Sequence, residues 1–203
     1  MTHQSLTAHT RPAELFITRL RTETSPAHEA LENLAISKAI VSPAVREKDY
    51  VDYLSLMANV VHDAETNIFP TVKDVIPDLD CRRKLPTILD DLAFHGAEKT
   101  AFTTVFRADE NLTEAFAVGV VYVMEGSSLG GRMILKNLDK SLGLNSERGS
   151  RYFTGYGAQT GFRWKSFMEW LAGYESSHDC GHDIIRGANH AFASIHRHFA
   201  QHS

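Results

Sequence analysis

The chain has 203 residues, of which 43% are hydrophobic and 23% are charged, and its formal net charge is −4. This composition is ordinary for a folded globular protein, and the negative charge gives no sign of the basic surface that nucleic-acid binding needs. The sequence contains no signal-peptide core, no apolar run near the roughly 20 residues of a membrane span, and too few cysteines for a disulfide framework. We therefore expect one cytoplasmic domain over residues 12–203, preceded by a disordered tail over residues 1–11.

The first half of the chain predicts three helices. Apolar residues spaced three and four apart predict a helix over about residues 13–34, within which Ser25-Pro26 marks either a bend or the start of a second helix. We favour one continuous, bent helix. Ser42-Pro43 opens a helix that is expected to end at Pro70, and another helix covers about residues 80–95.

The stretch from Ala115 to Leu138 predicts one helix, with Asn111 as the candidate N-cap. It contains four glycines, each of which costs about 1 kcal/mol relative to alanine in a helix interior. Gly119, Gly126 and Gly130 fall within about 40° of one another when successive residues turn by about 100°. A helix face without side chains indicates that another helix or a flat ligand approaches this backbone closely.

The last third of the chain continues the helical pattern. A glycine-rich loop is expected over residues 155–161, followed by helices over about 162–174 and 188–199. The sequence shows no convincing strand, no internal repeat and no low-complexity segment. The expected fold class is therefore all-α, with about seven or eight helices in one domain.

His28 is the first residue that suggests chemistry. Arg21 precedes it by seven residues, which places the guanidinium two turns away on the same helix face. A lone helical histidine is more often structural than a ligand. An imidazole on one wall, bare glycine backbone on the other and a nearby cation for an anionic end together describe a slot that fits heme.

The segment RTETSPAHEALE (21–32) resembles the proximal helix of bacterial heme oxygenases, and VYVMEGSSLGG (121–131) resembles their distal helix. The stretch GSRY (149–152), followed by WKSF (164–167), is similar to the part of the family that comes next. The resemblance runs from about residue 13 to 200 in the same order and spacing. The two helix motifs are specific only in combination.

The resemblance implies roles for individual residues. His28 would ligate the heme iron through neutral imidazole, while Arg21 and Tyr122 would face the propionates, with Lys165 as a less closely aligned propionate candidate. Gly126 and Gly130 would let the distal helix pass close to iron-bound dioxygen. Some family members have an aspartate directly after the first distal glycine as the anchor of a water network. This chain has Ser127 there, so Ser127, Arg132 and backbone carbonyls are the candidate anchors.

The resemblance also implies a reaction, which is the oxidative cleavage of heme to biliverdin, ferrous iron and carbon monoxide. Heme would be both prosthetic group and substrate, with dioxygen as co-substrate. A pocket without a titratable side chain over the iron favours oxidation of the porphyrin itself, because ordered water then delivers the proton. A ferredoxin or a flavin-dependent reductase would supply electrons. Iron acquisition and bilin supply to a bacteriophytochrome are both open as the purpose.

Other readings of the same residues remain open. The segment from Gly126 to Gly130 is also a small-xxx-small helix-packing motif. A di-metal carboxylate site would need a pattern that His62, Asp63, Glu65 and Glu175 do not complete. The histidines near the C-terminus are most simply solvated surface; they are His178, His182, His190, His196, His198 and His202. A heme carrier or sensor of the same fold would also need His28, so turnover alone separates it from an oxygenase.

Overall fold

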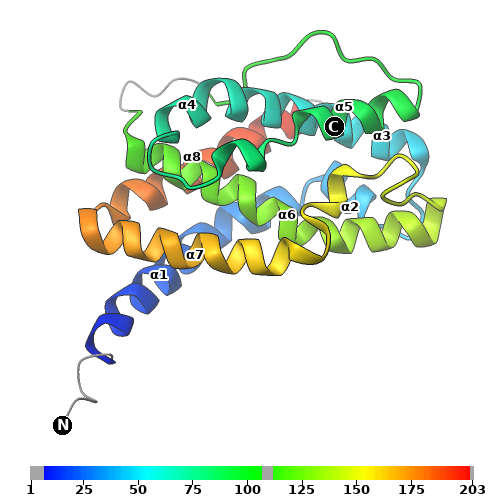
Figure 1. Ribbon diagram of the computed structural model, residues 1–203. Helices are drawn as coiled ribbons and strands as arrows, with labels where there is room; N and C mark the ends of the chain where they lie inside the picture. The colour runs from blue at the N-terminus through cyan, green and yellow to red at the C-terminus, as the bar shows by residue number, and fades with distance from the viewer. Residues whose placement is uncertain (1–6, 107–111, 202–203) are drawn as a thin grey trace.

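The computed structural model describes residues 7–106 and 112–201, and these residues form an all-α fold, as the sequence predicts (Figure 1). The described part contains eight α-helices: α1 Thr7–Glu32, α2 Ala35–Ile40, α3 Glu47–Asp63, α4 Phe69–Val72, α5 Leu85–Phe94, α6 Glu114–Leu142, α7 Thr160–His178 and α8 Gly181–Ala200. A π-helical turn, Ala64–Ile68, joins α3 to α4, and a 3₁₀ turn, Leu79–Arg82, precedes α5.

Helix α1 is continuous through Ser25-Pro26, so the expectation of one helix rather than two is confirmed. It begins at Thr7, earlier than the expected start near residue 13. Pro26 has no N–H to donate, which removes one hydrogen bond from the helical ladder. Two residues earlier, the Thr24 hydroxyl donates to the Leu20 carbonyl oxygen at 2.8 Å. The interruption at proline is therefore local, and packing on neighbouring helices keeps the two halves in one element.

The prediction of one helix between Ser42-Pro43 and Pro70 is wrong at both ends. Helix α3 begins at Glu47, where the Asp49 carboxylate accepts the Arg46 backbone N–H at 2.9 Å and caps the first turn. Pro70 does not close a helix but lies in the first turn of α4, directly after the π turn. The intervening π turn carries the chain between them.

Helix α6 runs through the middle of the molecule and extends the expected glycine-bearing helix to Leu142 (Figure 1). Its N-cap is Thr113, whose side chain accepts the Phe116 N–H at 3.2 Å. The predicted cap, Asn111, lies outside the described residues. Helices α7 and α8 are also longer than expected: α7 continues past Tyr174 to His178, and α8 begins at Gly181 because Ile184 and Ile185 are already buried in its first turns.

The first glycine of the α6 stripe serves helix packing. A Cβ atom on Gly119 would lie 2.0 Å from the Ile184 carbonyl oxygen of α8, and one on Gly187 would lie 2.0 Å from the Phe116 carbonyl oxygen of α6. Two glycines, one on each helix, therefore let the backbones of α6 and α8 touch. For Gly119, the open choice between a helix and a ligand is settled in favour of a helix.

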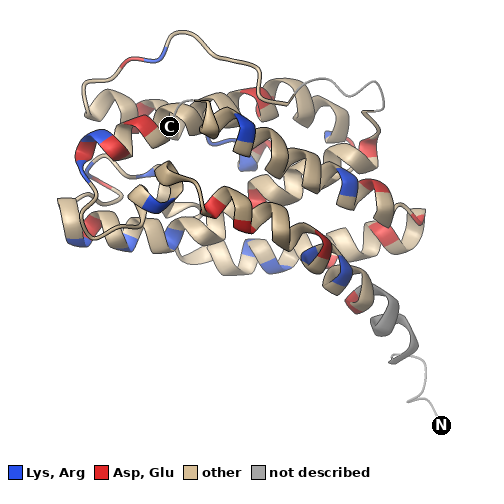
Figure 2. Cartoon of the chain, turned by 180° about the vertical axis from the view of Figure 1, so that it is seen from behind, with Lys and Arg blue, Asp and Glu red and all other residues tan. Residues whose placement is uncertain are grey.

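Charged residues of both signs are interspersed over the helices rather than gathered by sign on one face (Figure 2). Within the described ranges, no helix is both long enough and apolar enough to cross a membrane. The functional site is therefore located from the local geometry of the helices, because no charge patch marks it.

Candidate functional site

His28 and Arg21 lie on the same side of α1, and both side chains are exposed. The His28 imidazole is 51% exposed, packs edge-on against Phe192 of α8 with ring centroids 5.2 Å apart, and has Nε2 3.6 Å from Glu32 Oε1. Phe192 supports one edge of the ring while the other side stays open. The imidazole is therefore accessible to a ligand that approaches from outside the helix pair.

Tyr122 of α6 lies within electrostatic reach of α1. Burial raises the pKa of the Tyr122 phenol, while the positive charge of Arg21 and the nearby polar side chain of Thr24 act in the opposite direction. These influences require the phenol, Arg21 and Thr24 to be neighbours. The structure thus brings together two of the three residues that the sequence predicts to bind anionic propionates.

One turn beyond Tyr122, the glycines of α6 face a different environment from Gly119. The Trp164 ring of α7 covers Gly126, and an added Cβ atom there would lie 3.6 Å from it. A Cβ atom on Gly130 would have no heavy atom within 4 Å. Leu129 and Met133, on either side of Gly130 in the chain, are large apolar residues that remain exposed. This turn of α6 therefore presents bare backbone and apolar side chains to open space.

Two of the predicted site residues, Lys165 and Ser127, contact residues of their own helices. The Lys165 side chain is 77% exposed, and its Nζ lies 3.7 Å from Glu169 Oε1 on the same helix. The Ser127 hydroxyl donates to the Met124 carbonyl oxygen at 2.6 Å. A serine that bonds back into its own helix competes with the backbone ladder, so the glycine-rich turn is intrinsically weak.

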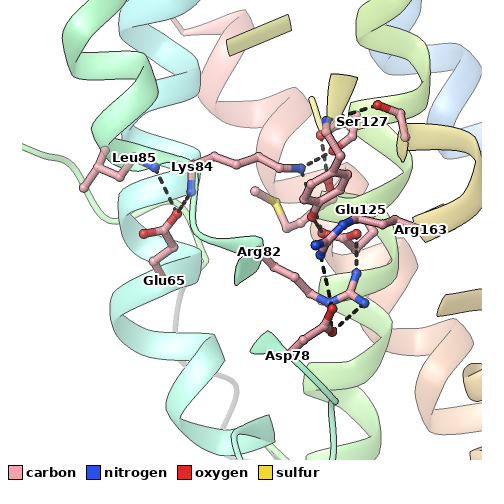
Figure 3. A network of polar contacts seen from close by, with 12 residues as sticks. Glu65, Asp78, Arg82, Lys84, Leu85, Glu125, Ser127 and Arg163 are labelled. Carbon is pink, nitrogen blue, oxygen red and sulfur yellow. Dashed lines mark hydrogen bonds and ion pairs between the residues drawn. The ribbon is translucent and has the colours of Figure 1, made fainter. Parts of the chain in front are cut away.

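A buried ionic network holds this turn from the opposite side of α6 (Figure 3). The Glu125 carboxylate is 3% exposed and accepts hydrogen bonds from Arg82 Nη1 at 2.5 Å and from the Tyr156 hydroxyl at 2.7 Å. Lys84 donates to the Ser128 hydroxyl oxygen, and its Nζ lies 3.9 Å from Glu125 Oε1. Buried charges need such partners, because an unpaired one is expensive to desolvate.

The electrostatics of this network follow from burial. Burial lowers the pKa of Lys84, and the carboxylates of Glu125 and Glu65 partly oppose that effect. Burial and the adjacent Glu125 raise the pKa of Tyr156, so its phenol stays protonated and donates. A cavity of about 10 Å³ remains among these side chains and Tyr152, enough for about one water molecule.

Sequence reasoning missed Arg82, Lys84 and Tyr156. One signal pointed to them, which is Glu125 itself. It directly follows the apolar run from Ala115 to Met124, and a carboxylate at that position of a core helix requires a buried cation. The sequence cannot say which of the 21 lysines and arginines supplies it.

Comparison with known proteins identifies the family. A family model described as heme oxygenase matches residues 14–201. The NO- and CO-bound heme oxygenase of Neisseria meningitidis is similar, with a TM-score of 0.76 and 26% identity over 92% of this chain and 91% of that one. No curated protein matches the chain significantly. The chain belongs to the heme oxygenase family.

Two further heme oxygenase structures support the fold. The Leptospira interrogans enzyme has a TM-score of 0.76 at 18% identity over 92% of this chain and 98% of that one. The enzyme of the cyanobacterium Synechocystis, solved in complex with heme, has a TM-score of 0.67 at 16% identity over 92% and 91%. As a heme oxygenase, the chain is a heme-degrading oxidoreductase that uses heme as substrate and dioxygen as co-substrate and needs electrons from a reductase.

The residues of this heme oxygenase fit its substrate. An accessible imidazole suits iron, the bare backbone at Gly130 admits a flat ring, exposed Leu129 and Met133 suit its apolar edge, and Arg21 suits its carboxylates. A surface hollow of about 570 Å³ lies between α1 and α8 and is lined by Ala27, Ala30 and Arg197. No residue of α6 lines that hollow, so volume alone does not locate the heme site.

Two acidic residues considered for a di-metal site accept hydrogen bonds from backbone N–H groups instead. Asp63 accepts the backbone N–H groups of Val105 at 2.8 Å and Phe106 at 2.6 Å, and Glu65 accepts those of Lys84 and Leu85. Over residues 7–106 and 112–201, no three His, Cys, Asp or Glu side chains gather as metal ligands.

Among the histidines near the C-terminus, the expectation of a solvated surface is wrong for His198, which is buried with Nε2 3.2 Å from Asn59 Nδ2.

Proposed function

We propose that this heme oxygenase cleaves heme to biliverdin, ferrous iron and carbon monoxide. Two observations carry the proposal: the His28 imidazole on α1 is accessible and the backbone of Gly130 on α6 is uncovered. The same two helices bring Arg21 and Tyr122 together. Both helices lie in a chain that matches the family from residue 14 to 201. The bound heme would supply the iron at which dioxygen is activated, and the protein supplies orientation.

Each proposed binding residue has a distinct task. The neutral His28 imidazole would donate its Nε2 lone pair to the iron, which requires Nε2 to turn away from Glu32. Arg21 and the protonated Tyr122 phenol would bind propionate oxygens. They lie close together, and burial keeps the phenol in its donor form. Lys165 would reach a propionate only after leaving Glu169.

The glycine turn of α6 would set how the reaction proceeds. Gly126 and Gly130 present no side chain, so these two residues would supply no acid or base to split an O–O bond. A backbone this close would instead restrict the direction in which dioxygen tilts and so select one edge of the porphyrin. Ser127 holds its hydroxyl proton on the Met124 carbonyl and offers its oxygen lone pairs to ordered water.

The electrons would come from a ferredoxin or a flavin-dependent reductase. The described structure contains two free cysteines, Cys81 and Cys180, which suits a reducing cytoplasm. The products would serve either iron acquisition or bilin supply to a bacteriophytochrome.

The test begins with hemin binding and continues with turnover. Hemin is added to the protein and the Soret band recorded, and a reductant is then added in air. We expect the Soret band to decay as biliverdin absorbance grows. His28→Ala should slow this decay at least about tenfold, equivalent to about 1.4 kcal/mol of barrier. His182→Ala is the matched control, since that ring is 82% exposed and lies far along the chain from the site.

Two outcomes would contradict the proposal. A hemin complex that never bleaches, even with ferredoxin and its reductase, would indicate a carrier or sensor rather than an oxygenase. Biliverdin formation by His28→Ala at the wild-type rate would remove His28 as the iron ligand.

A further inference from the structure

A continuous series of aromatic contacts follows α7 from the proposed site to the protein surface. Successive ring centroids lie 5.7 Å apart for Tyr122–Trp164, 6.2 Å for Trp164–Phe167, 5.6 Å for Phe167–Trp170, 5.3 Å for Trp170–Tyr174 and 4.4 Å for Tyr174–His178. We call these six residues the aromatic ladder. Three of these contacts, Trp164–Phe167, Trp170–Tyr174 and Tyr174–His178, are stacked, with interplanar angles of 26–28°.

The inner end of the ladder touches the glycine turn. The Trp164 ring lies 3.6 Å from the position of a Cβ atom on Gly126, and Tyr122 is the proposed propionate ligand. The outer end reaches solvent at His178, which is exposed on the last turn of α7. In Figure 1, α7 runs beside α6 in the opposite direction, so the ladder leads from the middle of α6 back toward its first turn.

The outer end also has a proton acceptor. The Tyr174 hydroxyl donates to Glu114 Oε1 at 2.5 Å, at the start of α6. Tyr174 is buried, whereas Trp170 and Glu114 are partly exposed. A phenol that gives up an electron becomes strongly acidic, so its oxidation is easy only where a base can take the proton. Glu114 supplies that base within one hydrogen bond.

Tryptophan and tyrosine are the side chains most easily oxidised by one electron through their rings, while phenylalanine is not. Phe167 therefore acts as a spacer between Trp164 and Trp170. The guanidinium of Arg82 lies 5.3 Å above the Phe167 ring, but Glu125 and Asp78 balance its charge. A positive charge on Trp164 or Trp170 would therefore not be repelled by an unpaired cation beside Phe167.

We propose that the aromatic ladder carries surplus oxidising equivalents from the oxygen-activating site to the surface, which protects the pocket when dioxygen activation fails to oxidise the porphyrin. This protective function rests on the proposed heme oxygenase reaction, which supplies the oxidant. It is separate from porphyrin cleavage, because the residues that it oxidises, Trp164, Trp170 and Tyr174, have no proposed contact with heme or dioxygen.

The electrons and protons of the proposed path balance. The oxidising equivalent takes one electron from the Trp164 indole, Trp170 refills Trp164, and Tyr174 refills Trp170. Tyr174 passes its phenolic proton to Glu114, leaving a neutral tyrosyl radical and a protonated carboxyl group. A one-electron reductant from solution, such as a thiol or ascorbate, then gives an electron to Tyr174 as Glu114 returns the proton.

The experiment detects the radical rather than turnover. The hemin complex receives one equivalent of an alkyl hydroperoxide without reductant, is frozen rapidly and is examined by electron paramagnetic resonance, with peptide mapping of oxidised residues. We expect a tyrosyl signal in the wild-type protein and its loss in Tyr174→Phe, with more oxidation at Trp170. Glu114→Gln, which keeps a hydrogen-bond acceptor but not the base, should also lose the tyrosyl signal.

Tyr53→Phe is the matched control, because Tyr53 contacts Phe153 and Phe199 and none of the ladder. An unchanged tyrosyl signal in Tyr174→Phe, or a loss confined to Tyr53→Phe, would overturn the proposal. Heme turnover without any protein radical would overturn the ladder and leave the oxygenase function intact. A protein that binds no hemin would overturn both, and the Soret band reports this separately.

Discussion

The two halves of α6 carry the same sequence signature and do opposite things with it. In the first half, Gly119 brings the backbone of α8 into direct contact, and the surrounding residues from Ala115 to Met124 are all buried. In the second half, Gly130 has open space beside it, and its neighbours Leu129 and Met133 are exposed. One bare helix face is thus closed by protein at one end and left for a ligand at the other.

The difference shows what an open glycine face requires. The first half is held by its own close packing, because α8 fills the space that side chains leave. The second half has no such cover and contains weak helix formers, so it must be held from behind. The network of Arg82, Lys84 and Glu125 supplies that support on the opposite side of the helix (Figure 3).

Removing the support should have the largest effect on stability. Arg82→Met leaves the buried Glu125 carboxylate without its closest cation, which should cost about 3–5 kcal/mol of unfolding free energy. Chemical denaturation measures the loss. Lys48→Met is the control, because Lys48 is 74% exposed, pairs with Asp52 on the surface and should change stability by less than about 1 kcal/mol. Equal losses in the two variants would contradict a special role for the network.

Closing the packed half more tightly should have the next largest effect. The methyl group of Gly119→Ala would lie 2.0 Å from a backbone oxygen of α8, which cannot move aside as a side chain would. We expect a loss of about 1–3 kcal/mol from overpacking, measured by thermal or urea unfolding. Gly173→Ala, on α7 with nothing within 4 Å of the new atom, should be neutral or slightly stabilising.

Filling the open half should leave the fold almost unchanged. Gly130→Phe adds a ring where the structure has free space, so its unfolding free energy should change by no more than about 0.5 kcal/mol. Hemin titration should instead show weaker binding or blocked turnover, because the ring occupies the proposed substrate space. Gly173→Phe controls for a large apolar side chain on a helix surface. Full turnover by Gly130→Phe would show that substrate does not approach this turn.

The smallest expected effect compares Tyr53, which packs against the core away from Arg21, with Tyr122, which lies near Arg21. Burial raises the pKa of Tyr53 to about 12, whereas Arg21 and Thr24 partly offset the effect of burial on Tyr122. A raised folded-state pKa stabilises the protein fully below the unfolded value near 10, and this contribution is lost as pH rises through the folded value. At pH 11, Tyr53→Phe should avoid about 1 kcal/mol of the wild-type loss of stability.

Tyr122→Phe should avoid less of that alkaline loss, because the cation beside it favours the phenolate. The unfolding free energies of the two variants are measured at several pH values between 9 and 11.5, and tyrosinate absorbance follows the ionisation. A difference of one pKa unit corresponds to about 1.4 kcal/mol. A larger effect at Tyr122 than at Tyr53 would contradict the proximity of Arg21 to Tyr122.

The sequence predicted the fold class and the positions of the long helices, because apolar spacing of three and four is set by the helix itself. It failed at Pro70 and at Ser42-Pro43, where residues that usually begin or end helices are overruled by the Asp49 cap and by a π turn. Local preferences are worth about 1 kcal/mol, and tertiary packing routinely exceeds that.

The candidate site divides in the same way. Tyr122 and Arg21 could be placed together because the family resemblance pairs their helices, and the structure makes them neighbours. The different tasks of Gly119 and Gly130 could not be separated, since both show only the absence of a side chain. Which face of α6 meets α8 is fixed by contacts across more than 60 residues of chain, and no local pattern records it.

The π turn between α3 and α4 changes which of the following residues face the core. Its five residues bond one position further along the chain than an α-helix would. Everything after it is therefore turned by about 100° relative to an uninterrupted helix. Phe69 and Val72 are buried after the turn, and Glu65 within it reaches the first turn of α5. Deleting one residue from this turn would rotate Phe69 and Val72 out of the core and remove the Glu65 cap from α5. The turn should therefore tolerate substitution far better than deletion.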